Sequence, residues 1–333
     1  MTLTSIGDLA RSFTLRNQMT QLKADLGQRS QEVTTGRIAD IGRALRGDFS
    51  PLTALDATLA RLDAFRSVTT EAALSTQAMQ ASLASVSDMS GRLGSTLLSV
   101  TGPGNPTSVD AIAKDALAQF RSAVAIFNTR VGDRSLFAGT ETRSAALAPA
   151  DVILDAVVAA AASATTAQDV ATAVDAWFAD QAGYATLAYT GGPALDPLTV
   201  AQGEAVPLEA TAADAGVRDT LKGLALAAML DRGTLAGNPA QRAELATAAG
   251  AVLLEAADAR GALAARIGTA EERIANATTR NSAEATALQI ARLGIISADP
   301  YDAATALTET ESQLDTLYAV TARLSRLSLA NYL

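Results

Sequence analysis

The chain has 333 residues, carries a net charge of −9 at pH 7 and contains neither Cys nor His. The missing Cys and His exclude thiol nucleophiles, disulfides and most zinc or iron sites, so we expect no catalytic, metal-binding or cofactor-binding residues and no enzyme. The acidic balance and an aromatic content of only 4% argue against a nucleic-acid partner, which calls for basic stripes and stacking aromatic side chains. With so few large side chains, we expect long helices packed along their length.

The N-terminal residues do not resemble a secretory signal, because Asp8 and Arg11 interrupt the place of an apolar core. The longest apolar runs, such as 156–164 and 224–230, are far shorter than the roughly 20 residues of a membrane span. We therefore expect no membrane insertion, and export, if it occurs, by a route that reads no cleavable signal.

Charge is unevenly distributed along the chain. Residues 145–220 hold ten acids and one base, whereas residues 1–47 hold seven bases and four acids, and residues 297–333 hold two bases and five acids. The net charges of these three segments are −9, +3 and −3. We expect the two ends to attract each other and the acidic middle to face solvent.

The first element expected in chain order is an N-terminal assembly helix within residues 1–47. Its apolar residues recur at spacings of three, four and seven, which places them on one narrow stripe of a helix. These predicted interface residues are Leu15, Met19, Leu22, Leu26 and Val33. Gly36 breaks the pattern, and residues 47–51 form a connector.

Residues 48–144 are expected to form the first half of a helical rod. Residues 51–100 hold a periodic apolar pattern without an internal proline, and Gly102 to Pro106 is a stop and reversal. Thr107, with Asp110 three residues later, predicts a capped restart. The following helix should fold back antiparallel on the first.

Residues 145–210 are expected to form a small, acidic, mixed α+β insert domain. The pattern predicts Ala-rich helices over 150–163 and 167–182, the second capped by Thr166. Residues 184–208 have the Gly, Pro, Thr and Val content of strands and turns, for example a strand over 185–190.

Residues 211–297 are expected to form the return half of the rod, with a helix over 215–230 and a second that starts with Asn238 as N-cap and Pro239 as first helical residue. A seam of apolar residues continues from there for some fifty residues.

Residues 298–333 are expected to form a C-terminal assembly helix, started by Asp299 as N-cap and Pro300. One apolar stripe runs along it and continues into an apolar chain end. The predicted interface residues are Leu307, Leu314, Leu317, Val320, Leu324, Leu327, Leu329 and Leu333. The stripe has no partner within its own helix, so we expect it to pair with the N-terminal helix and to leave apolar surface for a neighbouring subunit. The fold class predicted is mainly α: an elongated antiparallel helical rod with paired terminal helices and a small mixed insert.

Four local motifs accompany this nested order. They are Glu-Val-Thr-Thr-Gly-Arg at 32–37, Ser-Leu-Phe-Ala-Gly-Thr at 135–140, Ile-Gly-Thr-Ala-Glu-Glu-Arg-Ile at 267–274 and, most specific, Ala-Arg-Leu-Ser-Arg-Leu-Ser-Leu-Ala-Asn-Tyr-Leu at 322–333. With them the chain resembles the flagellin superfamily, and within it the hook-filament junction proteins (hook-associated proteins of type 3). In the insert the resemblance is limited to Tyr-Thr-Gly-Gly at 189–192.

The chain departs from the family pattern in two places. Gly-Asp-Phe-Ser-Pro at 47–51 stands where many relatives have Asp-Asp-Pro, and the Pro-Phe that often follows the motif at 135–140 is missing. Thr-Thr-Gly-Arg at 34–37 is closer to junction proteins than the Ser-Ser-Gly-Leu-Arg-Ile-Asn common in filament flagellins. The resemblance therefore favours a junction protein, with flagellin, the filament subunit, as the alternative.

The resemblance implies a structural protein of the bacterial flagellum that self-assembles through its terminal helices into a ring or short helical array. Its implied partners are a neighbouring hook-associated protein, flagellin and a flagellar export chaperone. It would be cytoplasmic before type III export and then lie at the hook-filament junction.

Two other classes of function compete with this interpretation. A cytoplasmic coiled-coil adaptor or signalling rod would keep continuous heptads and solvated ends, whereas this chain has a mixed insert and an apolar C-terminus. The second class is an enzyme that uses a pair of acids. Glu271 and Glu272, or Glu309 and Glu311, are one or two residues apart and point to different helix faces, so they are expected to be solvated rather than catalytic.

Overall fold

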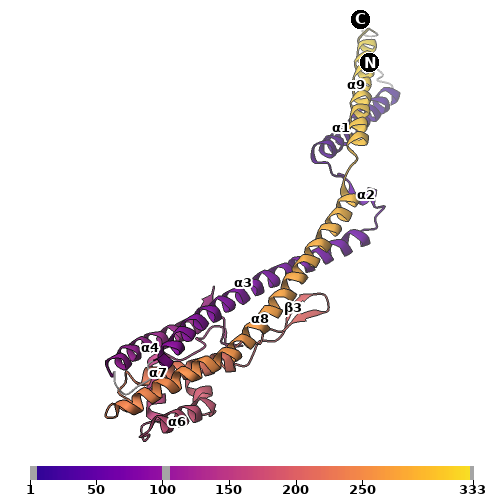
Figure 1. Ribbon diagram of the computed structural model, residues 1–333. Coiled ribbons are helices and arrows are strands. Elements are labelled where there is room, and N and C mark those ends of the chain that lie inside the picture. The colour runs from indigo at the N-terminus through magenta and orange to yellow at the C-terminus, as the bar shows by residue number, and fades with distance from the viewer. Residues whose placement is uncertain (1–5, 100–105, 331–333) are drawn as a thin grey trace. The chain divides into compact units, whose positions relative to one another are not determined.

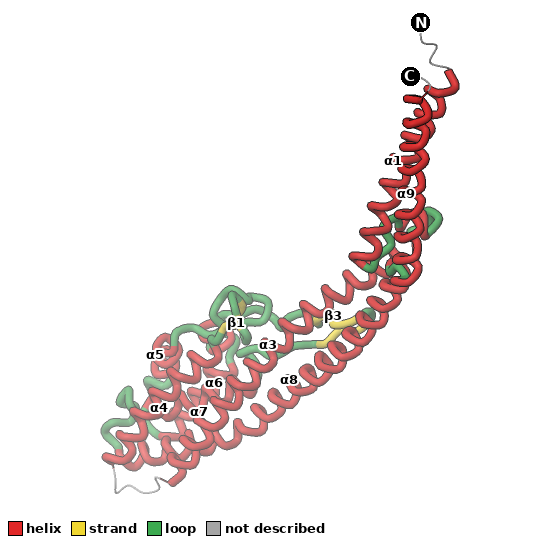
Figure 2. Tube along the Cα trace, turned by 90° about the horizontal axis from the view of Figure 1, so that it is seen from above, coloured by secondary structure: helices red, strands yellow, loops and turns green. Residues whose placement is uncertain are grey.

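The computed structural model describes residues 6–99 and 106–330. It is 74% helical with a small sheet content, which confirms the predicted mainly α fold with long helices. Strands are confined to two short antiparallel hairpins, drawn in yellow among red helices in Figure 2. The chain divides into two compact units, unit 1 with residues 1–62 and 283–333 and unit 2 with residues 63–282. The boundaries of the five segments expected from the sequence stay a prediction.

Unit 1 contains the two terminal helices, α1 (Ile6–Thr35) and α9 (Pro300–Ala330), and a short helix α2 (Ile41–Ala44) that the sequence did not predict. It also takes in the start of α3 (Ser50–Ser99) and the end of α8 (Pro239–Ile296). Arg292 of α8 binds Asp56 of α3 at 2.6 Å, which fixes the register of these two helix ends.

Unit 2 is built on four long helices: the rest of α3 and α8, together with α4 (Pro106–Phe127) and α7 (Ala215–Met229) (Figure 1). The predicted stop at residues 102–106 lies largely outside the described residues. Because α4 already begins at Pro106, the predicted N-cap at Thr107 is wrong. Asp110 instead binds Arg242 of α8 at 2.6 Å.

Within unit 2, α3 and α8 run antiparallel and approach closely at two glycines. Gln80 donates a hydrogen bond of 2.8 Å to the carbonyl of Ala264, and further along a Cβ on Gly250 would lie 2.9 Å from the carbonyl oxygen of Gly94. Small residues at a crossing let the backbones come together, and this close approach is how a chain poor in large side chains buries area. The predicted start of α8 is confirmed, because Asn238 accepts a hydrogen bond from the backbone N–H of Gln241.

Residues 145–210 share the hydrophobic core of the long helices. Their helices are α5 (Ala150–Ala160) and α6 (Ala167–Ala179), and Thr166 caps α6 as predicted by accepting from the N–H of Asp169. Side chains with no exposed surface, such as Leu154 and Val174, belong to one continuous cluster with Phe120 of α4 and Leu224 of α7. The core therefore runs through the segment expected to be peripheral.

The strand predicted over residues 185–190 is wrong, because this segment is a π-helical turn, η1 (Tyr184–Ala188). Its buried residues, Tyr184 and Ala188, are four apart, as on a helix. The Tyr184 hydroxyl donates to the carbonyl of Ala212 at 2.6 Å, and burial raises the pKa of this phenol. Strands occur later, in the hairpin of β3 (Leu198–Ala201) and β4 (Glu204–Val206), where Gly203 has a φ of +75°.

Two sequence motifs meet beyond the other hairpin, β1 (Arg130–Val131) and β2 (Arg134–Ser135). The N–H of Thr140 donates to the carbonyl of Pro193 at 2.8 Å, and the N–H of Gly192 donates to the carbonyl of Ala138 at 2.9 Å. Gly139 lies between them with a φ of +58°, and a Cβ there would be 2.2 Å from the Pro193 oxygen. The Leu-Phe-Ala-Gly-Thr and Tyr-Thr-Gly-Gly motifs are thus two halves of one tightly packed contact.

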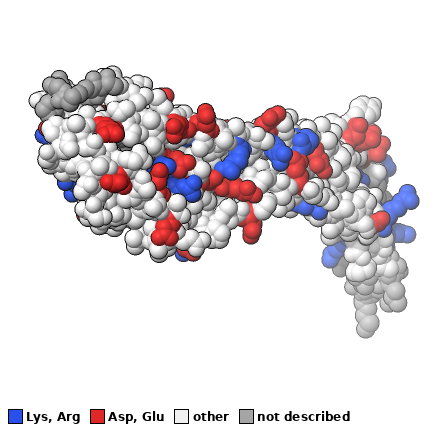
Figure 3. All heavy atoms as spheres, turned by 60° about the horizontal axis from the view of Figure 1, so that its bottom comes forward, with Lys and Arg blue, Asp and Glu red and all other residues white. Residues whose placement is uncertain are grey.

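Acids of the middle segment form ion pairs with bases on α4, on α7 and in the turn after α7. Asp151 binds Arg121 and Arg232, each at 2.7 Å, and Asp175 binds Lys222 at 2.7 Å. The hydrogen bond from Arg121 holds the pKa of Asp151 below its usual value. Acidic and basic side chains consequently lie beside one another on the face seen in Figure 3. These exposed pairs contribute little stability each but remove much of the expected negative field.

Arg260 on α8 is buried without an acidic partner. It is 3% exposed, one guanidinium nitrogen donates to the Thr220 hydroxyl at 2.8 Å, and its Nε has no partner in the described part of the chain. Burial lowers the pKa of this guanidinium. Taking a charge out of water without a counterion is destabilising.

We expect Arg260→Met to stabilise the folded protein, by about 1 to 3 kcal/mol in urea denaturation, because the Met side chain removes the buried charge and keeps most of its volume. Thr220 stays satisfied, since its hydroxyl donates to the carbonyl of Gly216. Arg280→Met, which removes an exposed pair with Glu204, is the control and should cost no more than about 1 kcal/mol. A variant of Arg260 less stable than the parent chain would contradict this account.

No helix in the described residues is both long enough and apolar enough to span a membrane.

Candidate assembly surface

The terminal helices α1 and α9 pack against each other in unit 1, as the two apolar stripes predict. The start of α9 is capped as expected: the Asp299 carboxylate accepts from the N–H groups of Tyr301 at 2.8 Å and Asp302 at 3.2 Å. Pro300 is the first helical residue, where its missing N–H leaves no helical hydrogen bond unmade.

A short backbone ladder closes the base of this helix pair. The N–H of Ile38 donates to the carbonyl of Ile296 at 2.9 Å, and the N–H of Ala298 donates to the carbonyl of Gly36 at 3.0 Å. Gly36 has a φ of +65°, which allows α1 to end and the chain to turn into the ladder. The chain segments after α1 and before α9 are thereby tied together.

The buried side chain of Glu32 stabilises the base of this helix pair through two hydrogen bonds. It is 8% exposed, accepts a hydrogen bond of 2.9 Å from Arg29 and another of 3.1 Å from the N–H of Ala39. Arg29, which interrupts the apolar stripe, therefore neutralises a buried carboxylate. The motif at 32–37 indicates a turn here. The spacing of the apolar residues does not identify Glu32 as part of that turn.

The predicted interface residues are only partly covered within one chain. Val33 and Val320 are each 43% exposed. The other described ones are half-buried: Leu15, Met19, Leu22, Leu26, Leu307, Leu314, Leu317 and Leu324. The side chains of Leu327 and Leu329, and all of Leu333, lie outside the described residues. Among the described side chains of α1 and α9, only those of Glu32 and Ala303 are buried.

A groove of about 370 Å³ lies between the two helices. Its apolar lining comes from three predicted residues, Leu22, Leu317 and Val320, and the rest is polar: Gln18, Gln21, Asp25, Gln313 and Thr316. The apolar spacing does not identify these polar residues, because they lie beside the stripe and carry no periodic signal of their own.

Among the described side chains, the opposite charges of the two ends do not form ion pairs with each other. In the described residues no ion pair therefore joins α1 to α9. A cation–π contact does join them, because the Nζ of Lys23 lies 5.9 Å from the centre of the Tyr318 ring. Tyr318 is 42% exposed and Phe13 of α1 is 67% exposed. Both are large side chains on this surface that the heptad spacing did not select.

The part of the chain that the structure describes contains no group of three or more His, Cys, Asp or Glu residues that could hold a metal ion. The described surface of α1 and α9 consists of half-buried apolar side chains, side-chain amides and a few charged groups. This mixture is suited to contacts with other proteins.

Residues 253–333 match a family model described as the bacterial flagellin C-terminal helical region. Among solved structures, the chain is similar to a flagellar hook-associated protein from Vibrio parahaemolyticus, at 16% identity and a TM-score of 0.47, over 75% of this chain and 96% of that one. No curated protein matches. Flagellin regions are structural and non-enzymatic, in agreement with the expectation that the chain is not an enzyme. This match covers about a quarter of the chain, namely α9 together with the C-terminal part of α8.

Proposed function

We propose that the chain is a structural protein of the bacterial flagellum that assembles with copies of itself through α1 and α9. The observation that carries this proposal is the half-burial of the predicted seam: side chains such as Leu22 and Leu317 line the groove between the two helices and still expose apolar surface. An isolated helix is marginal in water, and most of its stability comes from packing of its apolar face. Neighbouring copies would complete that packing.

A head-to-tail mode of assembly fits the surface better than a closed dimer. The two helices present different residues, with Phe13 and Lys23 on α1 and Tyr318 and Val320 on α9. When each partner contributes a different surface, the contact repeats as a ring or a helical array. The proposed interface comprises the predicted residues of both helices, including Leu327, Leu329 and Leu333.

Within the flagellum we propose the junction between hook and filament as the site of this protein. The support is the motif Thr-Thr-Gly-Arg at 34–37, which ends α1 and enters the ladder at the base of the helix pair. In this role the protein would contact a neighbouring hook-associated protein on one side and flagellin on the other. It would leave the cytoplasm by the flagellar type III route with the help of an export chaperone.

The filament subunit itself, flagellin, is the second candidate. The match of residues 253–333 to a region described as the bacterial flagellin C-terminal helical region favours it. The two candidates differ in what a cell loses when the protein is absent.

Electron microscopy of cells that lack this protein distinguishes them. We expect hooks without filaments and flagellin shed into the medium, because a filament cannot attach without a junction. Re-expression of the full chain should restore filaments. Bare hooks with no flagellin in the medium would indicate the filament subunit, and normal filaments would contradict both candidates.

A further inference from the structure

A second groove lies in unit 2, between α8 and the segment that follows β4. It has a volume of about 220 Å³. We call it the 206–210 groove, and its lining is Val206, Pro207, Leu208, Glu209, Ala210, Leu263, Arg266, Ile267, Thr269, Ala270 and Arg273. This is smaller than the roughly 300–1,000 Å³ of pockets for drug-sized ligands, so it suits one or two side chains.

The segment 206–210 has the form of a strand without a partner. Val206, Leu208 and Ala210 are buried and the two residues between them are exposed, the alternation of a half-buried strand. Its ladder with β3 ends at Val206, and in the described residues no backbone hydrogen bond is made by Leu208, Glu209 or Ala210. Unpaired backbone groups on an extended segment are a template for pairing with another extended chain.

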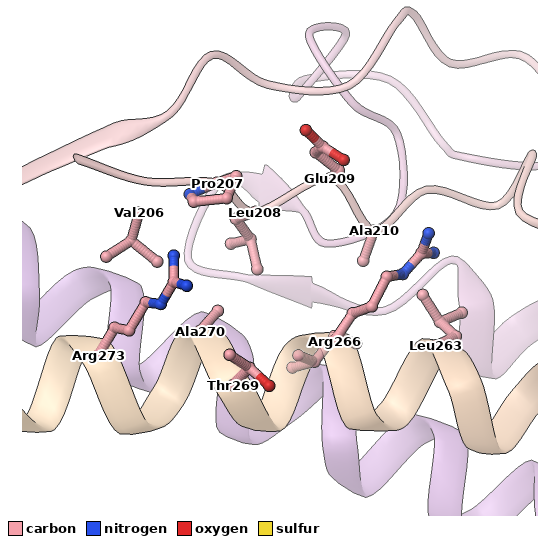
Figure 4. Close-up of a pocket in the computed structure, with 11 residues that line it drawn as sticks. Val206, Pro207, Leu208, Glu209, Ala210, Leu263, Arg266, Thr269, Ala270 and Arg273 are labelled. Atoms are coloured by element: carbon pink, nitrogen blue, oxygen red, sulfur yellow. The ribbon is translucent and has the colours of Figure 1, made fainter.

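The groove has an apolar floor with an arginine at each end, and Glu209 lines it from the 206–210 segment. Leu263, Ile267 and Ala270 of α8 are each at most 4% exposed and form the floor with Leu208 above them. Figure 4 shows the side chains of Arg266 and Arg273 rising from α8 on either side of Ala270 and Thr269. An apolar side chain that enters between them would be covered by the floor and flanked by guanidinium groups.

The two arginines differ in their own contacts. Arg266 binds Asp214, which lies just before α7. Arg273 makes no ion pair or side-chain hydrogen bond within the described range, and its side chain is exposed. A guanidinium group presents a fork of donors that matches a carboxylate. Arg273 is therefore free to bind an acidic group on a partner.

We propose that the 206–210 groove binds an extended peptide segment of another protein chain, which carries an apolar residue and an acidic residue two positions apart. Side chains two positions apart point to the same side of a strand and are roughly 7 Å apart along it. Ala270 and Arg273 are three residues apart, roughly 4.5 Å along α8, and the flexible arginine spans the difference. The apolar residue fills the groove, the carboxylate binds Arg273, and the backbone pairs with 207–210.

The test uses the full-length protein, at concentrations where sedimentation shows a monomer, and a fluorescein-labelled peptide Thr-Asp-Thr-Leu-Thr-Asp-Thr. Acids on both sides of the Leu let the probe bind in either strand direction. We expect saturable binding by fluorescence polarisation. Replacing both Asp by Asn, or the third and fifth Thr by Pro, should each weaken binding at least tenfold, because the first removes the carboxylates and the second the backbone donors.

Protein variants locate the site. Arg273→Gln should weaken binding at least tenfold, and Thr269→Phe, at an exposed position on the rim, should block the groove without disturbing the core. Arg92→Gln, an exposed arginine of α3, is the matched control and should bind as the parent chain does. Circular dichroism confirms that each variant is folded.

The proposal is overturned if the probe shows no saturable binding up to the highest protein concentration at which sedimentation still shows a monomer. It is also overturned if Arg273→Gln binds as well as the parent chain, or if the proline peptide binds as well as the probe. None of these outcomes depends on assembly through α1 and α9, so the failure of one proposal leaves the other intact.

Discussion

Leu317→Asp should abolish self-assembly while leaving unit 2 folded. Leu317 lines the groove between α1 and α9 opposite Leu22, and a carboxylate there would be desolvated in every contact that covers the seam. We expect the concentration required for polymerisation to rise at least a hundredfold, which corresponds to about 2.7 kcal/mol per added subunit. Sedimentation and electron microscopy of purified protein measure the effect.

Ser312→Asp is the matched control for this substitution. Ser312 is exposed on the same helix and outside the groove lining, so it adds the same charge without entering the seam. It should polymerise as the parent chain does. Removal of residues 325–333 should act in the direction of Leu317→Asp and leave a folded protein that no longer joins hook to filament. Normal polymers from both seam variants would contradict the proposed assembly surface.

Gly139→Ala should be the most destabilising single substitution in unit 2 that we describe. The new Cβ would lie 2.2 Å from the Pro193 oxygen and 2.5 Å from the Gly192 oxygen, at a φ of +58° that L-residues rarely adopt. Backbone strain of about 1 to 2 kcal/mol and a steric conflict of about 1 to 3 kcal/mol add up to a loss of roughly 2 to 5 kcal/mol, with a central value near 3 kcal/mol. For a unit of this size the melting temperature should fall by roughly 6–12 °C.

Gly132→Ala separates strain from crowding. Gly132 has nearly the same φ, +57°, but an added Cβ would meet nothing within 4 Å. Its cost should therefore be limited to about 1 to 2 kcal/mol of backbone strain. Equal melting temperatures for the two variants would contradict this account. They would show that the contact between the two motifs can shift to accommodate a Cβ at Gly139, and that close packing there does not stabilise the fold.

The helices could be predicted from the sequence wherever local chemistry sets their ends. Gly36 ends α1 through its left-handed backbone, and Asp299 starts α9 through its carboxylate. The segment from Tyr184 to Ala188 could not, because its turn depends on a tyrosine hydroxyl that bonds the carbonyl of Ala212, 28 residues later. Long-range contacts of this kind leave no periodic trace.

That the middle segment shares the core of the long helices could not be predicted from the sequence, for a similar reason. Its acids suggested a solvated insert, but Asp151 finds its bases 30 residues earlier, at Arg121, and 81 residues later, at Arg232. Composition reports the charge of a segment and not the position of its partners. Only the tertiary structure reveals that neutralisation.

The sequence predicts the pairing of α1 with α9 but not how far each side chain between them is buried. Of the residues that the apolar spacing selects, Leu22, Leu317 and Val320 line the groove between α1 and α9, and the use of the whole set in assembly stays a prediction. Their half-burial depends on how many helices surround the seam, which a repeat pattern does not specify. The buried Glu32 was missed because its role comes from a turn rather than from the stripe.

The ladder at Gly36 and Ala298 has a consequence for the order of folding. It joins chain segments whose separation makes direct closure entropically costly, by (3/2)RT ln n for a loop of n residues. Unit 2 contains nearly all of the intervening chain, so its folding shortens that loop before the ladder forms. The terminal helices should therefore pair last. A substitution such as Gly139→Ala, which destabilises unit 2, would then delay the pairing of the terminal helices although neither helix is changed. Its first visible effect would be slower assembly.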